Sequence, residues 1–214
     1  SVDFESKTSY AVTVTASDVV GESVSDDFTI SINDVNDTPT AVDLDASDID
    51  ENSQGGAVVG TLSATDQDSG DSHSYTLSGA DADQFEIVGD QLKLASGASV
   101  DFETKTSYAV TVTASDAGSE SVSNNFTISV NDVNDSPTAV DLDASDIDEN
   151  SLGGAVVGTL SATDQDSGDS HSYTLSGTDA DQFEIDGDQL KLASNASVDF
   201  ESKTSYAVTV TASD

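Results

Sequence analysis

The feature that most constrains this chain is an internal repeat with a period of 98 residues. Residues 39–116 and 137–214 differ at only five positions, and residues 1–18 are identical to residues 197–214. A period of this length corresponds to one small domain that recurs in tandem. The repeat predicts three modules: the C-terminal part of one at 1–36, a complete one at 37–134, and one lacking its last strand at 135–214.

Alternation of apolar and polar residues predicts strands nearly everywhere in the complete module. They are expected around residues 42–44, 58–64, 75–77, 85–87, 92–94, 108–114 and 122–130. Tyr108, Val110, Val112 and Ala114 share one face, and Val58, Leu62 and Ala64 mark the inward face of an earlier strand. About seven strands in a module of this size, without a helical stretch, predict an all-β chain of β-sandwiches.

The charge balance restricts the partners. The chain has 42 acidic residues against five lysines, a formal net charge of -37, and no cysteine. Phosphates of nucleic acid and of anionic membranes would repel it, and disulfides and thiolate sites are excluded. The charge must be solvated or neutralised by cations. The absence of an initiator Met and of a signal peptide predicts an internal piece of a longer protein.

Acidic motifs recur in the same order in each module and gather near a stiff joint. They are Glu51-Asn52, Asp66-x-Asp68-x-Gly70, Asp101-x-Glu103, Ala114-Ser115-Asp116 and Asp132-Val133-Asn134-Asp135. The only prolines, Pro39 and Pro137, follow the copies of the last motif and stiffen it. In an extended chain, Phe102 would point to the core while Asp101 and Glu103 point together to the other side.

Hard oxygen donors without cysteine favour Ca²⁺ over Zn²⁺. An EF-hand is excluded, because a loop counted from Asp66 has Leu77 where the twelfth-position Glu belongs. His73 and His171, one per module in a Gly/Ser/Asp loop, are predicted to be solvated and without a role.

The five ordered motifs resemble those of the cadherin repeat, over the whole complete module and both partial ones. The resemblance implies seven-stranded Greek-key sandwiches joined end to end, with about three Ca²⁺ at each junction. By that likeness the central junction uses Glu51, Asp101, Glu103, Asp132, Asn134, Asp135, Asp164, Asp166 and Asp214. The upstream junction uses Asp3, Glu5, Asp34, Asn36, Asp37, Asp66, Asp68 and Asp116, and Glu149, Asp199 and Glu201 are the equivalent ligands of the last module. The proline follows Asn-Asp one residue sooner than is common in the family, which leaves the carbonyl ligand near Ser136 open.

The absence of tryptophan removes the strand-exchange adhesion of classical animal cadherins, and the near-identical, arginine-free repeats look more like cadherin-like arrays of large bacterial surface adhesins. This likeness implies an extracellular, non-enzymatic extender that binds calcium and neighbouring modules of its own chain. The alternative is a cadherin-like module that itself binds polysaccharide or self-associates. It is less favoured because the aromatic residues of the complete module fall on inward positions.

Overall fold

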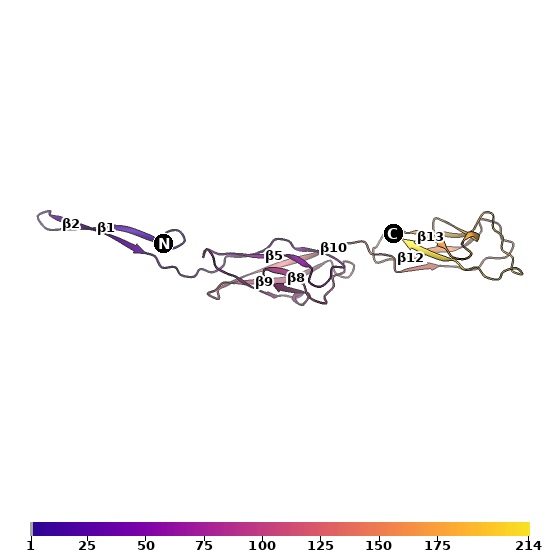
Figure 1. The fold of residues 1–214 in the computed structure, drawn as a ribbon, viewed down its shortest axis with the longest axis horizontal. Coiled ribbons are helices and arrows are strands. Elements are labelled where there is room, and N and C mark those ends of the chain that lie inside the picture. Colours follow the sequence, from indigo (N-terminus) through magenta and orange to yellow (C-terminus); the bar gives the residue numbers. More distant parts are fainter. Residues whose placement is uncertain (1) are drawn as a thin grey trace. The chain divides into compact units, whose positions relative to one another are not determined.

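The computed structural model describes residues 2–214 and consists of strands with two short 3-10 turns, η1 (Ala82–Gln84) and η2 (Ala180–Gln182) (Figure 1). The chain divides into two compact units, one ending at Asp132 and the other beginning at Val133. Unit 1 holds the N-terminal hairpin and residues 37–132 of the complete module. No helix among residues 2–214 is long and apolar enough to be a candidate membrane span.

The N-terminal segment is a two-stranded hairpin, β1 (Ser9–Ser17) and β2 (Ser23–Ser31), paired antiparallel from Ser9↔Ser31 to Ser17↔Ser23. β1 has the same sequence as β9 (Ser107–Ser115) of the complete module. Val14 of β1 is nevertheless 56% exposed, whereas the equivalent Val112 is fully buried. The sequence of this strand therefore sets which face is apolar, and the second sheet of the sandwich is what buries it.

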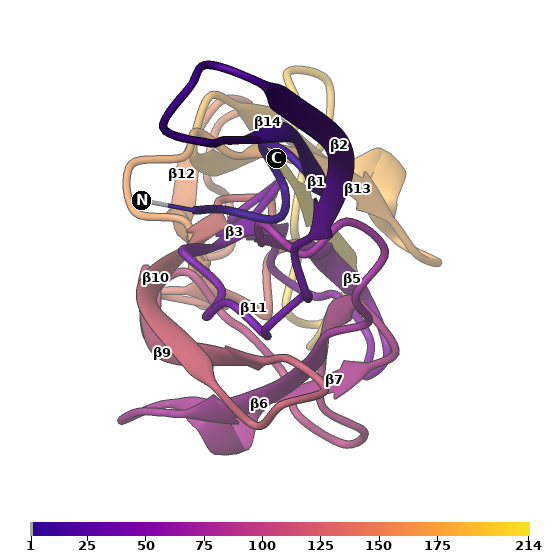
Figure 2. The ribbon, with the colours of Figure 1, turned by 90° about the vertical axis from the view of Figure 1, so that its left-hand side faces the viewer.

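The complete module consists of two four-stranded sheets packed face to face (Figures 1 and 2). One has the order β4-β10-β9-β6, made of Asp48–Asp50, Ser121–Asn131, Ser107–Ser115 and Ser74–Ser78. The other has the order β3-β5-β8-β7, made of Ala41–Leu44, Val58–Thr65, Gln91–Leu94 and Phe85–Val88. β9 lies between β10 and β6, antiparallel to both, whereas β4 pairs parallel with β10. The strand predicted around residues 42–44 is β3. A short strand that was not predicted, β4, follows it and belongs to the opposite sheet.

The core lies between these sheets, as the alternation predicts. Tyr108, Val110, Val112 and Ala114 are 8%, 2%, 0% and 0% exposed. The prediction is wrong at Val58, which is 49% exposed while Val59 is buried. The pairing of β5 with β8 shifts register between Val58 and Gly60, and this irregularity turns the strand by one residue, so that its inward face begins at Val59.

Unit 2 repeats most of this arrangement. One sheet has the order β11-β12-β15-β14, made of Ala139–Leu142, Val156–Thr163, Gln189–Leu192 and Phe183–Asp186. β13 (Ser172–Ser176) pairs antiparallel with β16 (Thr209–Ser213). Residues 146–148, which correspond to β4, form no strand, because in the complete module β4 pairs only with β10 and unit 2 contains no counterpart of β10.

Candidate metal centre

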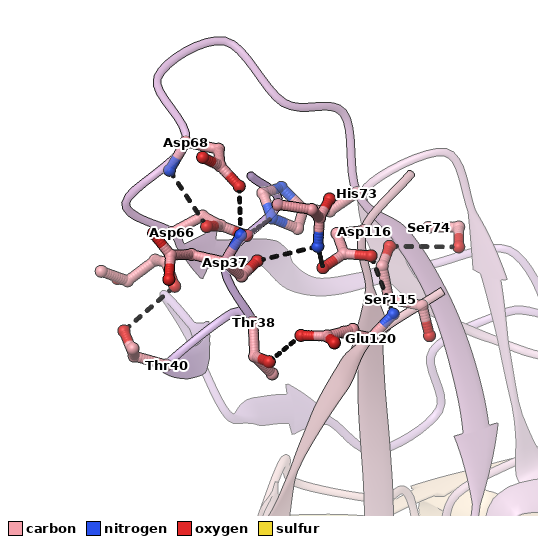
Figure 3. Close-up of polar contacts among 12 residues, drawn as sticks. Asp37, Thr38, Thr40, Asp66, Asp68, His73, Ser74, Ser115, Asp116 and Glu120 are labelled. Atoms are coloured by element: carbon pink, nitrogen blue, oxygen red, sulfur yellow. Dashed lines mark hydrogen bonds and ion pairs between the residues drawn. The ribbon is translucent and has the colours of Figure 1, made fainter. Parts of the chain in front are cut away.

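The linker, residues 34–39, is hydrogen-bonded directly to the acidic edge of the complete module, through Asn36 and through Asp37 and Thr38, which Figure 3 shows. Asn36 Nδ2 donates to Asp116 Oδ2 at 3.0 Å, and the Asp37 backbone N donates to Asp68 Oδ2 at 2.7 Å. Thr38 Oγ1 donates to a carboxylate oxygen of Glu120. These bonds hold an acidic linker against three further carboxylates, so the joint gathers negative charge.

The loop between β5 and β6 carries Asp66 and Asp68 (Figure 3). The Asp68 backbone N donates to Asp66 Oδ1 at 3.2 Å, and His73 Nε2 lies 3.1 Å from Asp66 Oδ2. The hydrogen bond from His73 is the main reason that the pKa of Asp66 lies below its usual value. The prediction of a solvated His73 is wrong, because its side chain is only 12% exposed and is bonded to an expected ligand.

Glu5, Asp34 and Asp68 form the first group of close carboxylates, each offering an oxygen within 4.8 Å of the others. They come from the preceding module, the linker and the complete module, all inside unit 1. A backbone hydrogen bond acts to lower the pKa of Glu5, but burial and the neighbouring carboxylates Asp3, Asp34 and Asp37 raise it on balance. Asp3 itself accepts hydrogen bonds from Ser6, which lower its pKa. Like charges this close favour a bound cation.

Glu51, Asp101 and Glu103 form a second group, also within 4.8 Å of one another. Glu51 follows β4 and is 3% exposed, and its Oε2 accepts a hydrogen bond from the Phe102 backbone N at 2.8 Å. Residues 102–104 form a turn, so the expectation of an extended chain here is wrong. Phe102 still packs against the core, and the turn brings Asp101 and Glu103 to Glu51.

Unit 2 repeats the linker contacts at equivalent positions. Asn134 Nδ2 donates to Asp214 Oδ2 at 2.7 Å, and the Asp135 backbone N donates to Asp166 Oδ2 at 2.6 Å. His171 Nε2 lies 3.0 Å from Asp164 Oδ2. Glu149, Asp199 and Glu201 form the equivalent of the second group, and all three are exposed. The same arrangement therefore appears in both units.

Among residues 2–214, three carboxylate oxygens are buried without a hydrogen-bond partner: Asp68 Oδ1, Asp71 Oδ2 and Asp166 Oδ1. A buried oxygen of this kind needs a partner, and a cation would supply one. The surrounding donors are carboxylate, amide and backbone oxygens, which are the ligands that Ca²⁺ prefers. The residues present therefore fit a calcium ion.

Sequence reasoning missed Asp71, His73 and Gly118 as parts of the site. Asp71 and His73 recur at the equivalent positions of the next module, which was an available signal. Gly118 had no such signal in the sequence. A Cβ at this position would lie 2.7 Å from Asn36 Cγ, so glycine leaves room for the linker side chain.

A family model of the cadherin domain matches residues 46–131 and 144–214. Human protocadherin Fat 1 is 30% identical over 229 residues, covering all of this chain and 5% of the relative. Human protocadherin gamma-A8 is 31% identical over 231 residues, covering all of this chain and 25% of the relative. The chain thus spans a small part of each relative.

Solved structures show the same likeness. The protocadherin gammaB4 extracellular domain has a TM-score of 0.71 and 25% identity over 99% of this chain and 35% of that one. A cis-dimer structure of protocadherin gammaB7 has a TM-score of 0.60 and 27% identity over 94% of this chain and 52% of that one. With two cadherin-domain matches over most of its length and the calcium-type acidic motifs in both units, the chain belongs to the cadherin family.

Proposed function

We propose that this chain is a calcium-rigidified extender segment of a secreted adhesin, which holds a distal ligand-binding region away from the cell surface. The observation that carries the proposal is the group Glu5, Asp34 and Asp68. Three segments (a preceding module, a linker and the complete module) each contribute one carboxylate to it. A cation there would tie the linker to the modules on both sides.

The same set of residues occurs once more along the chain. By the 98-residue offset, Glu103, Asp132 and Asp166 are equivalent to Glu5, Asp34 and Asp68. We propose about three Ca²⁺ for each junction, held by the residues that the cadherin likeness indicates. When bound, the ions neutralise carboxylates that otherwise repel one another.

Residues of the chain itself hold the linker in place before any cation binds. Asn36 and Asp37 bond the linker to Asp116 and Asp68, and Pro39 fixes the backbone just after them. Without the cation, repulsion among the carboxylates opposes the close approach of the linker to Asp116 and Asp68. Each sandwich keeps its core, so only the joint is expected to loosen.

The proposed adhesin is a bacterial surface protein, and the extracellular and bacterial parts of this proposal rest on chemistry and composition. Junction affinities in the range of extracellular calcium modules, from about 10⁻⁴ to 10⁻³ M, suit a calcium-rich exterior. The absence of arginine and tryptophan and the near-identity of the repeats support a long surface array.

Small-angle X-ray scattering of the 214-residue chain tests this function. We expect a larger maximum dimension and a narrower distance distribution in millimolar Ca²⁺ than in chelator. Mg²⁺ at equal ionic strength is the control, because it screens charge equally but prefers a stricter octahedral site. Identical profiles in Ca²⁺, Mg²⁺ and chelator would reject calcium rigidification.

The second candidate function is self-association, which the similarity to a protocadherin cis-dimer supports. Sedimentation velocity at several concentrations, with and without Ca²⁺, discriminates it from a monomeric extender. Polysaccharide binding is less favoured, because Phe85 and Tyr108 are buried and Tyr75, Phe102 and Phe126 pack against the core. Calcium-dependent binding on a glycan array would reverse that order.

A further inference from the structure

Each unit contains one histidine, and both are placed in the same way. The side chains of His73 and His171 are 12% and 13% exposed, and each contacts an aspartate that is 3% exposed. The contacts are 3.1 Å from His73 Nε2 to Asp66 Oδ2 and 3.0 Å from His171 Nε2 to Asp164 Oδ2. A partly buried imidazole that recurs with the same partner is a built feature of the loop.

The aspartate in each contact is the first member of the Asp-x-Asp motif. An ionised carboxylate only accepts hydrogen bonds, so Nε2 of the imidazole must carry the proton. Asp66 then receives one hydrogen bond on each oxygen, from His73 on Oδ2 and from the Asp68 backbone N on Oδ1. Each oxygen keeps a further lone pair, which leaves the carboxylate both fixed and able to bind a cation.

These contacts form a chain of hydrogen bonds that ends at the linker. From His73 it passes through Asp66 to Asp68, whose Oδ2 accepts the Asp37 backbone N–H at 2.7 Å (Figure 3). Asp68 Oδ1 remains buried and without a hydrogen-bond partner.

Unit 2 has the same chain. The Asp166 backbone N donates to Asp164 Oδ1 at 3.2 Å, and Asp166 Oδ2 accepts the Asp135 N–H at 2.6 Å. Asp166 Oδ1 is again buried without a hydrogen-bond partner.

We infer that His73 and His171 are positioning residues for the proposed calcium sites, acting through Asp66 and Asp164 and not as ligands themselves. Each imidazole orients its aspartate, the aspartate fixes the following turn, and the turn directs one free oxygen of Asp68 or Asp166 toward the cation. Outer hydrogen-bond partners of metal ligands commonly contribute about 10- to 100-fold in affinity. This inference rests on the proposed calcium binding.

The test compares two double variants of the 214-residue chain. His73→Gln with His171→Gln keeps a neutral N–H donor, whereas His73→Leu with His171→Leu keeps apolar bulk and removes the donor. Calcium affinity is measured by isothermal titration, and thermal unfolding in chelator monitors the fold. We expect the Leu variant to raise the apparent Kd by about 10-fold or more and the Gln variant to stay within about 3-fold of the wild type.

The outcomes distinguish the claim that the chain binds calcium from the claim that the histidines position the calcium ligands. No calcium binding by the wild type would reject the proposed function. Wild-type binding with an unchanged Kd in the Leu variant would overturn the positioning role, as would an equal loss in both variants. If the Leu variant does not fold in chelator, nitrogen NMR of the wild-type imidazoles decides. A proton fixed on Nε2 supports the inference, and a proton on Nδ1 alone overturns it.

Discussion

Removing one negative charge from the Asp68 position, while keeping its shape, should separate calcium binding from folding. In Asp68→Asn with Asp166→Asn, the amide oxygen can still accept the linker N–H that Asp68 Oδ2 accepts at 2.7 Å. The NH₂ group then occupies the place of Oδ1, which is buried and without a hydrogen-bond partner. A donor therefore faces the position where the cation is expected. The folded state without calcium is left with fewer repelling charges.

The size of the effect follows from binding linkage. Calcium at about 100 times its Kd stabilises the folded state by about 2.7 kcal/mol at one site. If the variant weakens binding about 100-fold, the same concentration equals its Kd and the stabilisation falls to about 0.4 kcal/mol. For a domain of roughly 100 residues, the calcium-induced rise in Tm should then fall from about 10–20 °C to about 2–3 °C.

Calorimetry in calcium and in chelator measures this change. The matched control is Asp83→Asn with Asp181→Asn, which removes the same charge at exposed positions in η1 and η2. We expect the control to keep the wild-type calcium shift, and neither variant to have a Tm in chelator below that of the wild type. A full calcium shift in Asp68→Asn with Asp166→Asn would refute the assignment of these oxygens.

Three further predictions concern the packing, the pH dependence and the linker. Leu94 is fully buried, so Leu94→Ala should lower the free energy of unfolding by about 2–5 kcal/mol in urea titrations, and a loss below about 1 kcal/mol would contradict the core described above. Lys105 Nζ lies 2.5 Å from Asp81 Oδ1, and that hydrogen bond lowers the pKa of Asp81. The pair therefore stabilises the fold above the unfolded-state pKa of Asp81, and this stabilisation is lost as the pH falls through the lower folded-state pKa. The wild type should lose stability below about pH 4, and Asp81→Asn should lose less over the same range. Equal stability profiles in acid for the two proteins would argue against the pair. Gly118→Ala should displace the Asn36 side chain and weaken calcium binding, as measured by titration calorimetry. Adding Asn36→Ala to this variant should cause little further loss of calcium affinity. Additive losses of affinity would show that the two positions act independently.

Alternation predicted the two long central strands well, because both pair regularly and bury one face. The ladder from Tyr108↔Ile128 onward has no irregularity, so a period of two holds along it. At Val58 the period fails because of the register shift before Gly60. A Cβ at Gly60 would lie 2.9 Å from Leu44 Cδ1 and would also meet the Ala46 carbonyl, a close approach that no local pattern reveals.

The recurring order of the acidic motifs predicted which residues are candidate ligands, but it did not predict the contacts that these residues make. Composition favoured a solvated loop around His73, since Gly, Ser and Asp are common in turns. The loop instead folds back so that the imidazole meets Asp66, seven residues earlier in the chain. Similarly, the sequence Asp101-Phe102-Glu103 predicted an extended chain. In the structure the Glu51 carboxylate accepts a hydrogen bond from the Phe102 N–H, and the segment forms a turn. Both contacts depend on residues outside the local pattern.

A crystal structure of the 214-residue chain grown in millimolar Ca²⁺, with an anomalous difference map, tests calcium binding most directly. The account predicts an anomalous peak among the carboxylates of Glu5, Asp34 and Asp68, with oxygen ligands at about 2.3–2.6 Å. Asp68 Oδ1, buried and without a hydrogen-bond partner, should be one of those ligands. Well-ordered carboxylates with no peak between them at that calcium concentration would contradict it.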